Sequence, residues 1–239
     1  MSGPETGNKL ISKVNGSSEN TSNTGAAINK SPVISGFANF ISVICHPVFM
    51  PLVMSIALWK LAPAGFTGMS SKQLMLLFVS IGVSTAFFPM FAILLMKPLG
   101  FISSYKMPSA RERTIPLMAS MIFYFWISHV LNNMAGAVPQ ILKILMLGNF
   151  WGIILIFIAN IFTRVSMHTA AAGGIIGIII VLMISSSVNM ILPLFAAILL
   201  AGVIGSARLY LGAHQRGDVW LGYVIGIIVQ LGAYIYTNI

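Results

Sequence analysis

Three short segments of the chain carry ionisable side chains at fixed spacing. They read "KMPSARER", "VSMHT" and "ARLYLGAHQRGD". The side chains in question are Lys106 and Arg113, then His168, then Arg208, His214 and Asp218. Phosphoryl transfer needs cations around the phosphate oxygens, a nucleophile in line with the leaving group and a proton donor for the leaving oxygen. These residue types therefore predict a site for a phosphate-bearing ligand.

Each of these side chains has a role in such a transfer. His214 can attack phosphorus through one ring nitrogen while a carboxylate holds the proton of the other nitrogen. Asp218 lies four residues further on and reaches that imidazole if the segment turns helically. His168 then protonates the leaving oxygen. The cationic cradle consists of Lys106, Arg113 and Arg208.

The scheme requires neither a metal ion nor another cofactor. Cys45 is the only cysteine, so no intramolecular disulfide or thiolate metal cluster can form. A zinc site also lacks its usual ligand pairs. His46 and His129 fall outside the three segments, and we interpret them as helix-end or interhelical hydrogen-bonding residues. His46 is also a candidate to line a substrate entrance.

The elements that position these residues are membrane helices by composition. Of 239 residues, 57% are hydrophobic and only 7% are charged, and the formal net charge is +9. A soluble domain of this length would need a more highly charged surface. The Lys and Arg residues are spread between apolar segments, without the basic run of a nucleic-acid-binding protein. A membrane surface and an anionic substrate are therefore the expected partners, and nucleic acid is not.

The gaps between charged residues delimit about seven spans, because a helix needs about 20 mostly apolar residues to cross the hydrocarbon. The expected spans are 38–59, 74–96, 114–131, one between Lys143 and Arg164, two between Arg164 and Arg208 with a turn at 185–189, and a last one after Asp218. Asp218 stands where the N-cap of the last span is expected. The predicted fold class is an all-α polytopic transmembrane bundle of six or seven spans.

The chain divides into a tail and one helical domain. Residues 1–36 are rich in Ser, Asn, Gly and Thr, so we expect a disordered polar tail, followed by a transmembrane domain over 37–239. Gly222 and Gly226 have the GxxxG spacing that lets helices pack closely. Two crossings separate each polar segment from the next, so all three are expected on one membrane face. The flanking cations interpreted as topology signals are Lys97, Arg111, Arg164 and Arg216.

The three segments together resemble the signature of the phosphatidic acid phosphatase type 2 superfamily. That signature has a Lys, six residues and Arg-Pro; then Pro-Ser-Gly-His; then Ser-Arg, five residues, His, three residues and Asp. This chain keeps the spacing and order of the ionisable residues, followed by "VWLG", over a motif-bearing core of about 106–222. It departs from the signature at Thr114, Val165, Met167 and Ala207. Glycine at position 167 would let a backbone amide approach phosphate closely, whereas Met167 narrows the site.

The resemblance implies a membrane-embedded lipid phosphatase that works without metal. It implies His214 as the nucleophile that forms a phosphohistidine, Asp218 as its partner and His168 as the general acid. The phosphate ligands that it implies are Lys106, Arg113, Ser166 and Arg208. The expected substrate is a phosphomonoester or pyrophosphate of a lipid, such as phosphatidic acid, phosphatidylglycerol phosphate or an isoprenyl pyrophosphate.

Two alternatives remain open from the residues. The first is a non-catalytic lipid-binding or transport protein that keeps the cationic basin. The second is a membrane protein whose polar clusters only anchor helix ends, which predicts that His168, His214 and Asp218 lie more than about 10 Å apart. We expect a multi-pass protein of the bacterial inner membrane. Counting Lys and Arg places the motif face inside the cell, whereas the resemblance implies the outer side.

Overall fold

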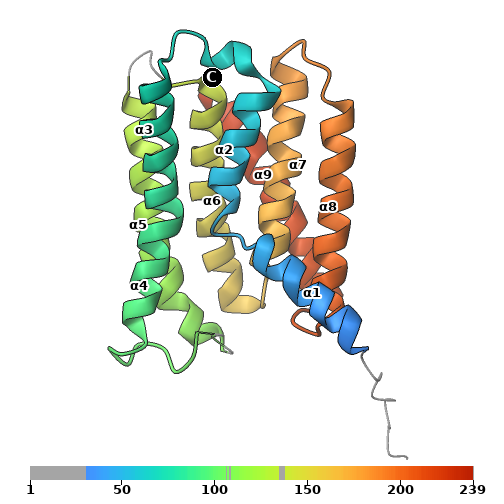
Figure 1. The fold of residues 1–239 in the computed structure, drawn as a ribbon. Coiled ribbons are helices and arrows are strands. Elements are labelled where there is room, and N and C mark those ends of the chain that lie inside the picture. Colours follow the sequence, from blue (N-terminus) through green and yellow to red (C-terminus); the bar gives the residue numbers. More distant parts are fainter. Residues whose placement is uncertain (1–30, 106, 108, 135–137, 239) are drawn as a thin grey trace, which may run out of the picture. The chain divides into compact units, whose positions relative to one another are not determined.

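The computed structural model describes residues 31–105, 107, 109–134 and 138–238, and every regular element within them is helical (Figure 1). The α-helices are α1 (Pro32–Ile44), α2 (Met50–Leu61), α3 (Ser71–Gly82), α4 (Phe88–Met96), α5 (Ala110–Asn133), α6 (Gln140–Phe162), α7 (Met167–Ser185), α8 (Ile191–Tyr210) and α9 (Arg216–Thr237). A short 3₁₀ turn, η1 (Pro63–Phe66), follows α2, and a π-helical turn, η2 (Val83–Phe87), joins α3 to α4. The prediction of an all-α fold is confirmed for this part of the chain.

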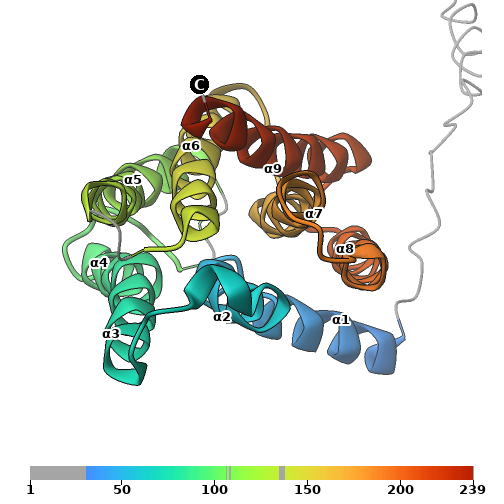
Figure 2. The same ribbon diagram turned by 90° about the horizontal axis from the view of Figure 1, so that it is seen from above.

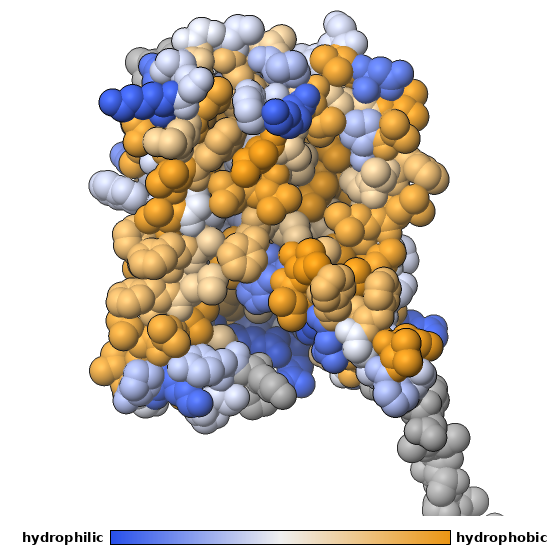
Figure 3. Space-filling view, in the orientation of Figure 1, coloured by the Kyte–Doolittle hydropathy of each residue, from blue (hydrophilic) through white to orange (hydrophobic). Residues whose placement is uncertain are grey.

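Six helical segments among the described residues are long and apolar enough to cross a membrane, as in a multi-pass membrane protein. They are Ser71–Met96, Glu112–Asn133, Gln140–Phe162, Met167–Ser185, Ile191–Tyr210 and Arg216–Thr237. Figure 3 shows apolar side chains over the middle of the bundle and hydrophilic ones toward its two ends. The expected spans from residue 74 onward correspond to these six segments.

The first expected span, 38–59, is wrong, because the chain breaks there into the two short helices α1 and α2. α1 has 13 residues and α2 has 12. Pro47 has no backbone N–H and disfavours helical backbone in the residue before it, so the helix ends near Ile44. Pro51 lies in the first turn of α2, where proline is tolerated. α1 begins at Pro32, so residues 32–36, expected in the tail, are helical; residues 1–30 of that tail lie outside the described residues.

Helices α7 and α9 cross in close contact, as the glycine spacing predicts. A Cβ atom on Gly222 would lie 2.8 Å from the carbonyl oxygen of Ser166, and one on Gly226 would collide with the carbonyl of Ala170. Figure 2 shows α9 lying directly against α7. This contact fixes the first turn of α7, which carries His168, against the first turns of α9.

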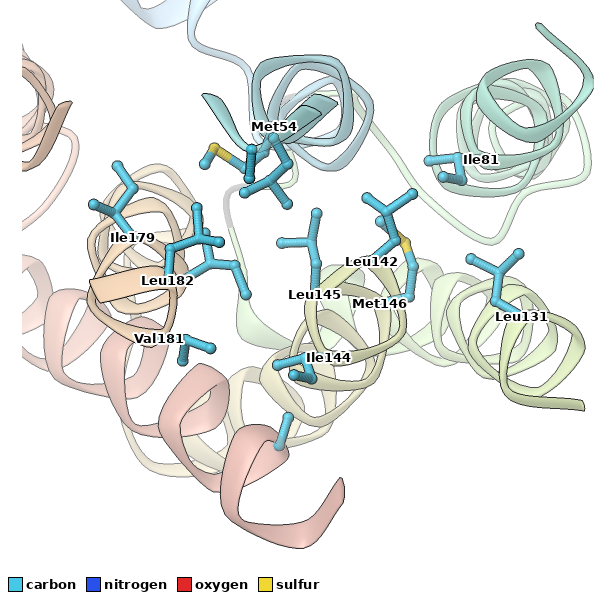
Figure 4. Packing of buried hydrophobic residues seen from close by; sticks show 14 of the residues in the cluster. Met54, Ile81, Leu131, Leu142, Ile144, Leu145, Met146, Ile179, Val181 and Leu182 are labelled. Atoms are coloured by element: carbon cyan, nitrogen blue, oxygen red, sulfur yellow. The ribbon is translucent and has the colours of Figure 1, made fainter. Parts of the chain in front are cut away.

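The bundle has two ends of different character. We name the end that carries the connections 97–105, 163–166 and 211–215 the motif end, and the opposite one the far end. Figure 1 shows these three connections at the same end of the bundle. The main hydrophobic cluster fills the far half, with Leu131 near the end of α5, Leu142 near the start of α6 and Leu182 near the end of α7 (Figure 4). The prediction that the three polar segments share one face is confirmed for their described residues.

Candidate functional site

A cavity of about 630 Å³ opens at the motif end and receives side chains from all three polar segments. The predicted site residues that line it are Arg113 from α5, His168 from α7, Arg208 from α8 and His214 from the connection between α8 and α9. Its volume lies in the range of ligand-binding pockets, about 300–1,000 Å³. Figure 3 shows hydrophilic side chains in a hollow at this end of the molecule. The ionisable residues therefore converge on one space instead of anchoring separate helix ends.

His214 is held in a defined tautomer. Its side chain is only 7% exposed, and its Nδ1 atom lies 2.9 Å from the carbonyl oxygen of Arg164. A carbonyl oxygen can only accept, so Nδ1 carries the proton and Nε2 keeps its lone pair. The sequence predicts only a topology role for Arg164, yet its backbone carbonyl orients the imidazole.

Asp218 does not hold His214 as expected. The distance between Asp218 Oδ2 and His214 Nδ1 is 3.9 Å, too long for a hydrogen bond. The carboxylate instead accepts from Thr163 Oγ1 at 2.8 Å and from the backbone N–H of Gln215 at 3.0 Å. Gln215 is the N-cap of α9 and Asp218 is its third residue, so the N-cap prediction is also wrong. His214 precedes the helix, and the expected helical i,i+4 geometry therefore does not form.

His168 and Arg208 meet at Ser42, a residue of α1 that lies outside the three predicted segments. His168 Nε2 donates to the carbonyl oxygen of Ser42 at 3.0 Å, and Arg208 Nη1 donates to the Ser42 hydroxyl at 3.3 Å. The His46 ring packs edge-on against His168 with centroids 5.6 Å apart, and His46 lines the cavity as expected. The only signal for Ser42 in the sequence is one hydroxyl in the apolar run "FISVIC".

The two described cations of the cradle have different bonding. Arg113 donates from Nε to the carbonyl oxygen of Met107 at 3.1 Å, which holds the preceding connection against α5. Arg208 has its Nε atom buried without a hydrogen-bond partner among the described residues. A guanidinium with unused donors facing a cavity is suited to bind phosphate oxygens. Lys106, the third predicted cation, lies outside the described residues, as does the side chain of Arg111.

Ser166 lies away from the cavity, although the resemblance implies that it binds phosphate. It is the N-cap of α7, it is fully buried, and its hydroxyl accepts from the backbone N–H of Thr169 at 3.4 Å. Its own backbone N–H donates to the carbonyl of Asp218 at 3.3 Å. Capping the helix occupies the hydroxyl, and the next side chain, Met167, lines the cavity instead.

The protein environment keeps the imidazole of His214 neutral. Burial lowers its pKa below the ordinary 6.5, the hydrogen bond to the Arg164 carbonyl opposes that shift, and the charges of Arg208 and Arg113 lower the pKa further. Burial and the charge of Arg208 also lower the pKa of His46. Near neutral pH, His214 therefore presents an uncharged Nε2 atom, which is the form that a nucleophile requires.

Comparisons with protein-family models, with curated proteins and with solved structures find no match to this chain. Among the described residues, no three His, Cys, Asp or Glu side chains gather as a metal ligand set. What defines the class of site is therefore its own geometry: imidazoles and guanidinium groups around one cavity, in a bundle of membrane-type helices.

Proposed function

We propose that the protein is a membrane lipid phosphatase that hydrolyses a phosphomonoester or pyrophosphate of a lipid through a phosphohistidine. The single observation that carries the proposal is the fixed tautomer of His214, because Nδ1 is bonded to the Arg164 carbonyl and Nε2 is left with its lone pair. This imidazole shares a cavity with His168, Arg113 and Arg208. The resemblance of the three segments to the type 2 phosphatidic acid phosphatases agrees with that chemistry.

In the first step, His214 Nε2 attacks phosphorus as the bond from phosphorus to the lipid oxygen breaks. The guanidinium groups of Arg113 and Arg208 neutralise the charge on the equatorial oxygens. The carbonyl of Arg164 keeps the Nδ1 proton in place and stabilises the positive charge that develops on the ring. The product of this step is a phosphorylated His214 and a lipid alkoxide that needs a proton.

His168 supplies that proton. The negative charge of a phosphate bound in the cavity favours the protonated ring of His168. Because Nε2 of His168 is hydrogen-bonded to the carbonyl of Ser42, the proton leaves from Nδ1 of that ring. Neutral His168 then takes a proton from water as the water oxygen attacks phosphorus and the bond to His214 breaks. Inorganic phosphate leaves, and both histidines return to their starting forms.

A lipid is the substrate class that the surroundings favour. The cavity belongs to a bundle with six apolar helices long enough to span a membrane, and its wall beyond the ionisable end is mainly apolar. Phosphatidic acid, phosphatidylglycerol phosphate and isoprenyl pyrophosphates each combine the phosphate and the chain that such a space accepts. We place the protein in the bacterial inner membrane, and a reporter fused after Ile239 identifies the side on which α9 ends.

Phosphate release from these three lipids in detergent, with a chelator present, tests the proposal. We expect release from at least one lipid, abolished in His214→Gln. No release from any of them overturns the proposal, and release abolished by the chelator overturns the metal-free mechanism. Lipid binding that is equal in wild type and His214→Gln, without release, identifies the non-catalytic binding or transport protein instead.

A further inference from the structure

Two amide side chains line the cavity at the end away from the phosphate site. Gln230 on α9 is fully buried, and Asn149 on α6 faces it. Gln230 Nε2 donates to Asn149 Oδ1 at 3.2 Å and to the carbonyl of Leu145 at 3.5 Å. Gln230 Oε1 and Asn149 Nδ2 are buried without a partner among the described residues. One acceptor and one donor therefore remain unused beside an otherwise apolar space.

The helices are built to admit the Gln230 side chain at this level. A Cβ atom on Gly148 of α6 would lie 2.6 Å from Gln230 Cδ, and one on Gly177 of α7 would lie 2.9 Å from Gln230 Cβ. Only glycine leaves this space on both neighbouring helices. The amide is thus seated between α6, α7 and α9, where the cavity meets the packed far half.

The cavity connects this amide pair to the phosphate site. Arg113 and Tyr124 of α5 both line it, and they lie eleven positions apart, which corresponds to a helical rise of about 16 Å. Its wall along that length includes Leu117, Ser120 and Ile153. The shape matches a charged headgroup at one end and a hydrocarbon chain along the remainder.

We propose that this space is a chamber for one hydrocarbon chain of the lipid phosphate, and that the amide pair of Gln230 and Asn149 is its floor and sets the chain length that it accepts. The proposal rests on the proposed function, because the phosphate site supplies the headgroup end. The unused oxygen of Gln230 and the unused N–H of Asn149 expose almost no surface, so only a water buried in the floor itself can pair with them. A chain that reaches the floor displaces that water and leaves both atoms unpaired.

The physical consequence is a break in affinity at one chain length. Each additional buried methylene strengthens binding by up to about fourfold while the chain is shorter than the chamber. A chain that reaches the floor loses about tenfold for each buried polar atom that it strips of water. Lipid phosphates with chains that end above the floor are therefore preferred over longer ones.

The test measures binding of a series of n-alkyl phosphonates of increasing chain length in detergent. Phosphonates carry the same headgroup charge but no ester oxygen to release, so binding is read without turnover. The variant Gln230→Met/Asn149→Leu gives the floor an apolar surface of similar volume. Comparing variant with wild type at each length cancels the partition of the ligand into detergent. We expect equal affinity for short chains and a gain of at least about tenfold for chains that reach the floor.

The matched control is Gly152→Ala, one helical turn from Gly148 on the same helix. Its added methyl would lie 3.5 Å from Val229 Cγ2, an ordinary contact, so it narrows the chamber without touching the amides. We expect weaker or unchanged binding at all lengths and no gain for long chains. Should the double variant not fold, Asn149→Leu alone removes one of the two unpaired atoms at a half-buried position.

A ratio of variant to wild-type affinity that is the same at every chain length overturns the inference and leaves the amides as a link between α6 and α9. The same holds if Gly152→Ala shows the gain for long chains. A length-dependent ratio in a protein that releases phosphate from no lipid retains the chamber and removes the proposed function. The two failures are therefore distinguishable.

Discussion

The two halves of the bundle differ in what they do with ionisable side chains. At the far end, His129 is exposed, stacks on Phe125 with centroids 5.6 Å apart and bonds to Asn133 of its own helix. At the motif end, the side chain of His214 is 7% exposed and bonds to a backbone carbonyl fifty residues away in the sequence. The difference shows that convergence of separate elements on one space, and not the presence of a histidine near a helix end, defines a candidate site.

The halves also differ in packing. In the far half, side chains such as Leu131, Leu142 and Leu182 leave at most 3% of their surface exposed, whereas the motif half encloses the cavity. The packed half stabilises the bundle through burial of apolar surface. In the motif half the short helix α2 forms part of the cavity wall through Met50, Pro51 and Met54.

The largest difference in phosphate release is expected between variants of His214 at the motif end and His129 at the far end. His214→Gln removes the proposed nucleophile and should reduce phosphate release by about 10⁴-fold or more. His129→Gln changes an exposed side chain at the far end and should leave the rate within about twofold. Initial rates in detergent, with melting temperatures to confirm folding, measure both. Equal losses in the two variants contradict the distinction between the ends.

A smaller difference, in kcat/KM, is expected between variants of Arg208 at the motif end and Lys143 at the far end. Arg208→Met removes a cation that lines the cavity and that we propose binds phosphate, so it should reduce kcat/KM by about 100- to 1,000-fold. Lys143→Met, at the far end, removes a side chain that bonds only to the carbonyl of Met134 among the described residues and should leave kcat/KM unchanged. Steady-state kinetics with a short-chain phosphatidic acid compare the two. An unchanged Arg208→Met variant contradicts the assignment of the cradle.

Asp218→Asn tests whether the Arg164 carbonyl, and not the Asp218 carboxylate, orients His214 at the motif end. An amide in place of a carboxylate that orients a catalytic imidazole costs about 10⁴-fold in a serine protease triad. Because Arg164 orients His214 here, we expect a loss of only about tenfold. The Asp218 carboxylate raises the pKa of His214, so its removal lowers that pKa further below 6.5. The neutral form then persists to lower pH, and the acid limb of kcat/KM shifts to lower pH.

Two results for Asp218→Asn would contradict this prediction. A loss near 10⁴-fold, or an acid limb that moves to higher pH, means that the carboxylate reaches His214 during the reaction. Wild-type protein measured over the same pH range is the reference, and the acid limb of its profile should lie below 6.5, the ordinary pKa of histidine.

The smallest effect is expected from Ser42, a positioning residue that holds Arg208. Ser42→Ala removes the hydroxyl bond to Nη1 but keeps the carbonyl that accepts from His168. We expect KM to rise by about fivefold with kcat nearly unchanged, and Ser42→Thr to restore it. Ser35→Ala, on the same helix, is the matched control. A fall in kcat without a change in KM contradicts the positioning role.

Much of the fold follows from the sequence because membrane helices reveal themselves by apolar length alone. The spans from residue 74 onward, the shared face of the three segments and the close packing at Gly222 and Gly226 are all confirmed. The prediction of a span at 38–59 is wrong because the whole stretch is apolar, and hydropathy therefore gives no sign of the break near Pro47. Hydropathy measures burial in lipid, whereas a proline acts through the geometry of one peptide unit.

The candidate site was predictable in its residue types but not in its bonding. The spacing of His214 and Asp218 suggested a pair, yet His214 lies in a connection where the helical reach does not apply. Ser166 carries the right side chain in the right segment, but its hydroxyl caps α7. Local sequence does not report which of several acceptors a donor finds once the chain is folded.

The sequence by itself determined the class of structure and the list of groups, since composition fixes the membrane solvent and residue type fixes the available chemistry. Only the tertiary structure decided that Arg164 orients His214, that Ser42 joins His168 to Arg208, and that Gln230 and Asn149 line the same cavity as these residues. These contacts join residues far apart in the chain. Helix packing sets their distances, and no spacing within one segment encodes them.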